Sequence, residues 1–129
     1  MCRMLIVEDN VPFRSILKEM LKTGFPGSSI IEAANGREAM ERFEDSMPQI
    51  IFLDIKLPDT TGLHLAKHMR GSSPAAHIFV LTSFDLPEYR NAAEANGANH
   101  FLVKGSVTSN EILELVGSVV ANVHRPGPI

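Results

Sequence analysis

Reactive side chains follow the ends of four short apolar runs in this sequence. They are the acids Glu8 and Asp9, the acid Asp54, the hydroxyl pair Thr82 and Ser83, and the amine of Lys104. If folding gathers them, the carboxylates repel one another, and a hard divalent cation relieves that repulsion through oxygen ligands. Mg²⁺ is favoured over Ca²⁺, because it commonly takes one or two carboxylates, water and phosphate oxygens. The set therefore predicts a magnesium site for phosphate chemistry.

Asp54 is the candidate nucleophile of this set. A carboxylate can accept a phosphoryl group while a metal and a nearby cation neutralise the charge on the phosphoryl oxygens. Lys104 would supply that cation, and Thr82 would supply a hydroxyl donor. The hypothesis is that Asp54 is phosphorylated in a Mg²⁺-dependent reaction.

Five apolar runs alternate with five amphipathic stretches, and these elements must position the reactive groups. The runs predict strands at residues 4–7, 28–33, 49–53, 77–81 and 99–103. Three- and four-residue spacing predicts helices at about residues 12–24, 36–46, 62–71, 88–96 and 108–120. In the first of these helices the apolar stripe is formed by Phe13, Ile16, Leu17, Met20 and Leu21.

Strands that alternate with helices predict an α/β fold, in which right-handed crossovers build a parallel sheet with helices on both faces. Ligands of such sheets bind beyond the carboxyl ends of the strands. All the reactive groups named above lie at those ends, so we expect them to share one edge of the sheet.

Composition limits the remaining possibilities. The chain has 129 residues, of which 44% are hydrophobic, and this suits one compact domain. The net charge of −3 without a cluster of Lys or Arg gives no reason to expect contact with nucleic acid or membrane. The lone cysteine, Cys2, excludes an internal disulfide. No run has the length of a membrane helix or the pattern of a signal peptide, so we expect a cytoplasmic protein.

Taken together, these motifs resemble the receiver domain of response regulators in two-component signalling, over about residues 3–123. Leu5-Ile6-Val7-Glu8-Asp9 resembles the first strand of the family with its acidic pair. Asp54 to Gly62, with Pro58, resembles the acceptor loop. Thr82-Ser83 and Lys104 match the switch hydroxyl and the lysine of the family. The resemblance predicts a receiver domain at residues 1–123 and a tail or linker at 124–129.

The resemblance implies a flavodoxin-like, doubly wound sheet of five strands in the order 2-1-3-4-5 with five helices. It implies phosphotransfer to Asp54 from a phosphohistidine, and Mg²⁺ held by Asp9, Asp54 and the backbone carbonyl of Lys56. Glu8 would join this site mostly through a water. Thr82 would move toward the phosphoryl group and Phe101 would follow it inward, which would change a partner surface. The domain would assist its own phosphorylation and dephosphorylation without being a conventional enzyme.

The implied partners are a sensor histidine kinase or phosphotransfer protein, and a downstream protein or covalently linked effector domain. A phosphorylation-dependent homodimer is a further expectation. The sequence departs from the family at Gly105, where proline is usual after the lysine, and at Phe101, where tyrosine is commoner. Lys56 and Phe84 lie two residues after Asp54 and Thr82, and we expect them to hinder water and slow dephosphorylation.

Several alternatives stay open at the level of single residues and of the whole chain. Asp9 or Asn10 could cap the first helix, Thr82-Ser83 could form a turn, and Lys104 could be a solvated cation. His64 and His68 lie four residues apart and could chelate a metal, although a solvated helix face is the simpler reading. The rival classes are an FMN-binding flavodoxin-type carrier and a haloacid-dehalogenase-type phosphatase. Glu8-Asp9 would repel the FMN phosphate, and the phosphatase places its nucleophile after the first strand.

Overall fold

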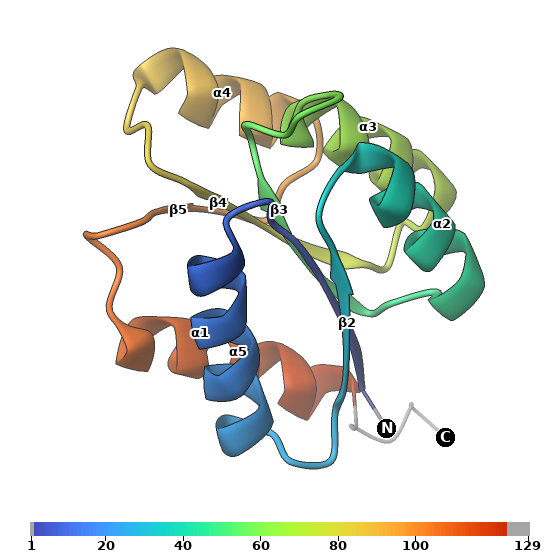
Figure 1. Cartoon of the computed structure of the whole chain (residues 1–129), viewed down its shortest axis with the longest axis vertical. Coiled ribbons are helices and arrows are strands. Elements are labelled where there is room, and N and C mark those ends of the chain that lie inside the picture. Colours follow the sequence, from blue (N-terminus) through green and yellow to red (C-terminus); the bar gives the residue numbers. More distant parts are fainter. Residues whose placement is uncertain (1, 124–129) are drawn as a thin grey trace.

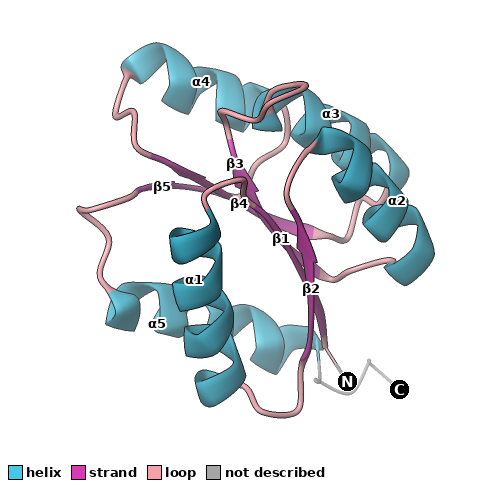
Figure 2. Ribbon diagram, in the orientation of Figure 1, coloured by secondary structure: helices cyan, strands magenta, loops and turns pink. Residues whose placement is uncertain are grey.

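A five-stranded parallel sheet lies between two layers of helices in the computed structural model, which describes residues 2–123 (Figures 1 and 2). The strands are β1 (Arg3–Val7), β2 (Ser29–Ala33), β3 (Ile50–Asp54), β4 (His77–Thr82) and β5 (His100–Val103). The helices are α1 (Val11–Gly24), α2 (Gly36–Ser46), α3 (Gly62–Ser72), α4 (Pro87–Ala95) and α5 (Ser109–Val123).

The strand order is β2-β1-β3-β4-β5, and every pair of neighbouring strands is parallel. This is the flavodoxin-like, doubly wound order that the sequence predicts. Helices α1 and α5 cover one face of the sheet, and α2, α3 and α4 cover the other (Figure 1). The winding direction changes between β1 and β3, which places the ends of these two strands at the position where such sheets bind ligands.

Alternating side chains of the central strands pack on opposite faces of the sheet. In β1, Leu5 and Val7 face the α2–α3 side, whereas Met4 and Ile6 face α1 and α5. All five residues of β3 are buried. The central strands are thus covered on both faces, which explains why they are continuous apolar runs in the sequence.

Side-chain caps fix the helix starts next to the strand ends. The Asn10 side chain accepts a hydrogen bond from the Phe13 amide (2.9 Å), so Asn10, and not Asp9, caps α1. Thr108 and Glu111 form a reciprocal capping box at α5, with hydrogen bonds of 3.1 and 3.0 Å. Most element boundaries differ from the predicted ones by one or two residues.

For one residue of the apolar stripe of α1, the prediction that it lies in the core is wrong. Ile16 is 66% exposed, whereas Leu17 and Leu21 are buried. Successive helical residues point about 100° apart, so Ile16 lies at the margin of the stripe that Leu17 centres. The stripe is narrower than the sequence spacing alone predicts.

The predicted tail or linker at residues 124–129 lies outside the described residues. Among residues 2–123, no helix combines the length and apolar character that crossing a bilayer requires.

Candidate functional site

Three acidic side chains meet beyond the carboxyl ends of β1 and β3. These strands are adjacent, with Val7 opposite Leu53, so the residues that follow them also lie together. Glu8, Asp9 and Asp54 each offer a carboxylate oxygen within 4.8 Å of the others. Glu8 and Asp54 are 2% and 8% exposed, whereas Asp9 lies on the surface. The structure therefore brings together the three carboxylates that the sequence singles out.

Lys104 follows β5, an edge strand of the sheet, and its side chain reaches this cluster. Its Nζ lies 3.2 Å from Asp54 Oδ2 and forms an ion pair with Glu8. The backbone of Lys104 is held by its amide, which donates to the Thr82 carbonyl (2.8 Å). Gly105 follows with φ of +87°, a left-handed conformation that glycine adopts at little cost. The lysine is therefore part of the site and not a solvated cation.

Burial in this cluster changes the pKa of Glu8. Burial raises the pKa of Glu8 to about 7, because a buried carboxylate loses hydration. The hydrogen bonds from Lys104 and the Asn10 amide act in the opposite direction, and the neighbouring Asp54 raises the pKa further. A divalent cation among these oxygens would favour the ionised form of Glu8, so the donor set fits the hard cation that the sequence predicts.

The loop after β3 holds Asp54 in place from behind. The Gly62 amide donates to the Ile55 carbonyl (2.9 Å), and a Cβ at Gly62 would overlap the backbone carbonyl of Asp54. Asp54 Oδ1 also lies 3.4 Å from the Lys56 amide. Only glycine permits this close approach, which explains the glycine at the start of α3.

The two predicted switch residues lie on β4 and β5, beside the carboxylates. Thr82 is fully buried, and its hydroxyl accepts a hydrogen bond from the Phe84 amide (3.2 Å). Phe101 is half-buried, and the Arg90 guanidinium covers its ring with the carbon atom 4.6 Å from the ring centroid. Arg90 also pairs with Asp85 (3.2 Å). Sequence reasoning missed Arg90.

Lys56 and Phe84 contact each other beyond the ends of β3 and β4. The Lys56 ammonium lies 5.2 Å from the centroid of the Phe84 ring, and both side chains are exposed. Phe84 also meets Tyr89 edge-on, with ring centroids 6.1 Å apart. The two positions that we expect to control water are therefore paired with each other.

Phe13 is a second residue that sequence reasoning missed as part of the site. Its ring centroid lies 4.4 Å from the Lys104 ammonium. The sequence places Phe13 in the apolar stripe of the first helix, so it predicts only a packing role for this residue. The available signal is its spacing, because a residue four positions after Asp9 falls in the first turn of a helix that starts beside the acids.

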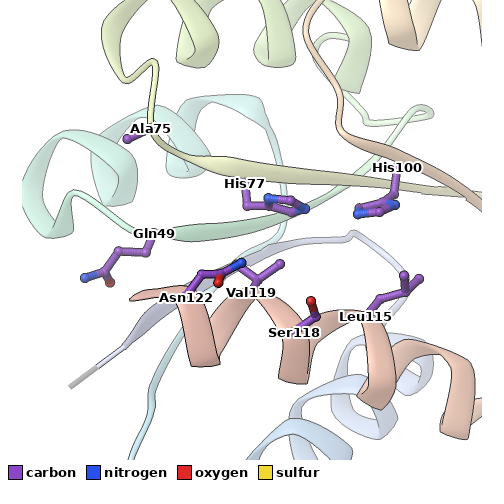
Figure 3. A pocket seen from close by; sticks show the side chains of 8 residues that line it. All are labelled: Gln49, Ala75, His77, His100, Leu115, Ser118, Val119 and Asn122. Atoms are coloured by element: carbon purple, nitrogen blue, oxygen red, sulfur yellow. The ribbon is translucent and has the colours of Figure 1, made fainter. Parts of the chain in front are cut away.

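One hollow along the sheet lies away from these groups. A cavity of about 360 Å³ opens at the amino ends of β4 and β5, against α5 (Figure 3). His77 and His100 lie side by side above Ser118, Val119 and Asn122 of α5. The remaining lining residues are Gln49, Ala75 and Leu115. This cavity contains none of the carboxylates described above.

Comparison with known proteins identifies the family. The family profile described as "Response regulator receiver domain" matches residues 4–117. The chain belongs to the receiver domain family. Receiver domains are the phosphoacceptors of two-component signalling and bind Mg²⁺ at an acidic pocket. In this receiver domain, Glu8, Asp9 and Asp54 form an acidic cluster that could hold a metal ion.

Related proteins include both short and long chains. The receiver domain is 34% identical over 103 residues to the chemotaxis protein CheY of Thermotoga maritima. This match covers 79% of this chain and 84% of that protein. It is 33% identical over 100 residues to the uncharacterized transcriptional regulatory protein YesN of Bacillus subtilis. That match covers 77% of this chain but only 27% of YesN.

Solved structures share the fold. A CheY-like receiver domain protein from Methanospirillum hungatei superimposes with a TM-score of 0.86 at 24% identity, covering 95% of both chains. A two-component response regulator from Clostridium difficile gives a TM-score of 0.88 at 23% identity, covering 97% of this chain and 100% of that one. The family match favours neither the flavodoxin-type carrier nor the haloacid-dehalogenase-type phosphatase.

Proposed function

We propose that this receiver domain accepts a phosphoryl group on Asp54 from the phosphohistidine of a sensor histidine kinase or phosphotransfer protein, in a Mg²⁺-dependent reaction. The observation that carries the proposal is the position of Asp54. Its carboxylate lies at the end of β3, within 4.8 Å of two further carboxylates and 3.2 Å from the Lys104 ammonium. A nucleophile flanked by both a cation and a metal site suits phosphoryl transfer.

In the proposed step an Asp54 carboxylate oxygen attacks the phosphorus atom of the donor. A P–O bond forms as the P–N bond of the phosphohistidine breaks, and the imidazole nitrogen keeps the electron pair and takes a proton. The two Asp54 oxygens have different surroundings, because Oδ1 lies near the Lys56 amide and Oδ2 near Lys104. These contacts orient the carboxylate before the donor arrives.

Glu8, Asp9 and Asp54 would hold the Mg²⁺, with the Lys56 carbonyl as a further proposed ligand and Glu8 acting mostly through a water. The bound ion supplies positive charge that screens the carboxylates from each other and from the phosphoryl oxygens. Lys104 provides a second positive charge beside Asp54 Oδ2. Because Lys104 pairs with both Glu8 and Asp54, it also limits their repulsion before the ion binds.

Thr82 and Phe101 form the proposed switch. The Thr82 hydroxyl exchanges its hydrogen bond with the Phe84 amide for one to the phosphoryl group, and Phe101 turns inward behind it. Phe101 lacks a hydroxyl, so its two positions differ only in packing, including the contact with Arg90. The altered surface of α4, β5 and α5 would then bind a downstream protein or a linked effector domain, or form a phosphorylation-dependent homodimer.

The proposed domain spans residues 1–123 and works in the cytoplasm, where its kinase partners present their phosphohistidines. The 27% coverage of YesN is compatible with a receiver joined to further domains, and the 84% coverage of CheY with a free-standing one. Direct contact of this domain with nucleic acid or membrane is not proposed, since its net charge is −3.

The test is phosphate uptake from a small phosphodonor such as acetyl phosphate, followed by intact-mass spectrometry with and without Mg²⁺. The wild type should gain one phosphoryl group only with Mg²⁺, and Asp54→Asn should gain none. Asp45→Asn is the matched control, because Asp45 is an exposed aspartate of α2 that is not part of the acidic cluster. Equal uptake by Asp54→Asn and wild type would refute the proposal.

A further inference from the structure

The Lys104 side chain must extend along the carboxyl ends of the strands to reach Glu8 and Asp54. Asp54 is the last residue of β3, which lies two strands from β5 in the sheet. Glu8 follows β1, which lies one strand further. Adjacent strands are about 4.8 Å apart and β4 lies between β5 and β3, so the Lys104 side chain must extend past the end of β4 toward the carboxylates. A lysine has four rotatable bonds, and its ammonium is a compact charge without a preferred contact direction. The position of this ammonium therefore depends on what surrounds it.

Besides the two carboxylates, the ring of Phe13 contacts this ammonium. The Nζ atom lies 4.4 Å from the ring centroid, within the range of a cation–π interaction. The side chain of Lys104 is 14% exposed, so the contact is largely shielded from water. Such shielding strengthens an electrostatic contact between a cation and a ring face.

The Phe13 ring is itself held in place from two directions. The amide of Phe13 donates to the Asn10 cap of α1 (2.9 Å), which fixes the backbone. The ring packs against the core on the α1–α5 side, which includes Leu17, Phe52 and Leu81. Phe13 also lines a small space together with Glu8 and Asp54. The Phe13 ring is therefore held by the cap of α1 and by core packing, and not by the carboxylates.

We propose that Phe13 is a positioning residue whose ring face holds the Lys104 ammonium over Asp54. This inference rests on the proposed function, because it concerns the cation that assists phosphoryl transfer. Gly105 makes the contact more important, since the residue after Lys104 supplies no side chain to the loop. Mg²⁺ bound at the carboxylates would weaken their pairing with Lys104, whereas the Phe13 contact involves neither carboxylate.

The experiment compares Phe13→Leu, Phe13→Tyr and Phe25→Leu with wild type. Leucine fills apolar space without a ring face, and tyrosine restores the face. Phe25→Leu is the matched control, because Phe25 packs against the same core without a contact to Lys104. We expect Phe13→Leu to slow phosphorylation by acetyl phosphate about three- to tenfold, and Phe13→Tyr to restore the rate. Phe25→Leu should change stability without changing the rate.

A spectroscopic readout separates positioning from general destabilisation. Protons above an aromatic ring resonate upfield, so the Lys104 side-chain methylene next to Nζ should be shifted upfield in wild type and Phe13→Tyr but not in Phe13→Leu. An unchanged rate or an unchanged Lys104 resonance in Phe13→Leu would overturn the positioning role while wild type still takes up phosphate. Failure of wild type to take up phosphate would overturn the proposed function and this inference together.

Discussion

The same strands form both the carboxyl edge and the amino edge of the sheet, but the ionisable groups at these two edges differ in charge. At the carboxyl edge, Glu8, Asp54 and Lys104 hold opposite charges in contact. At the amino edge, His77 and His100 stack with ring centroids 5.0 Å apart, and burial lowers the pKa of both. The neutral histidine rings at the amino edge pack against Phe79 of the core. The paired charges at the carboxyl edge instead form a candidate site for chemistry.

The difference shows that an open cavity is a poor guide to function in this molecule. The hollow of about 360 Å³ lies beside the neutral histidines, and the carboxyl edge is filled by its own side chains. Lys104 occupies the space between the carboxylates in the described structure. Where opposite charges occupy a site, side-chain chemistry locates the site better than volume does.

The largest expected effect comes from pushing Asp54 out of the carboxyl edge. Gly62→Ala places a methyl group against the Asp54 backbone carbonyl, so the β3–α3 loop must move. We expect at least about a tenfold loss of phosphorylation rate and about 1–3 kcal/mol less stability. Acetyl phosphate kinetics and urea unfolding measure the two effects.

Gly71→Ala is the control for that substitution, because Gly71 is also in α3 and has open space around its Cα. It should keep the rate and stabilise the helix slightly, since alanine favours helix more than glycine does. If Gly62→Ala behaved like Gly71→Ala, the close approach behind Asp54 would be unimportant.

The next effect tests the charge at Glu8. Its folded pKa of about 7 lies above the ordinary value of 4.5, so the folded state binds this proton more tightly than the unfolded state. The resulting stabilisation is complete below pH 4.5 and is lost as the pH rises through about 7. We expect metal-free wild type to lose about 2 kcal/mol over this range and Glu8→Gln not to show this loss.

Urea unfolding in the presence of a chelator measures this loss. Glu44→Gln removes an exposed glutamate of α2 and should retain the wild-type pH dependence. A pH dependence that survives in Glu8→Gln would place the titrating group elsewhere.

The residues of the carboxyl edge were largely predictable from sequence, because a polar residue that ends an apolar run must lie at the carboxyl end of a strand. Asp54 and Glu8 follow buried runs, and parallel strands bring such ends together. Phe13 and Arg90 could not be predicted in the same way, since their contacts depend on side-chain directions between elements far apart in sequence. The strand order came from the family resemblance, because alternating elements are compatible with more than one order.

A smaller effect is expected at the mouth of the carboxyl edge. Replacing Lys56 with Asn and Phe84 with Ser removes the paired side chains that we expect to hinder water. The phosphorylated protein should then lose phosphate about fivefold faster, which corresponds to about 1 kcal/mol in the barrier. Decay of the phosphorylated mass after removal of the donor gives the lifetime. An unchanged lifetime would mean that this pair does not control water.

The smallest expected effect lies at the amino edge. Burial lowers the pKa of His77, with the positive charges of His100 and Arg70 acting in the same direction. The folded state therefore favours neutral His77, and its contribution to stability is present above about pH 6.5 and is lost as the pH falls. His77→Phe should reduce this acid sensitivity, whereas exposed His68→Phe should not. Thermal unfolding from pH 7 to pH 5 compares them.

The most direct test of the central claim is to locate the phosphoryl group. Wild-type protein treated with acetyl phosphate and Mg²⁺ is reduced with borohydride, which converts an acyl phosphate to a stable alcohol, and is then digested and sequenced by mass spectrometry. We expect a single modified residue, Asp54. Modification at Asp9 or at any residue other than Asp54 would contradict it.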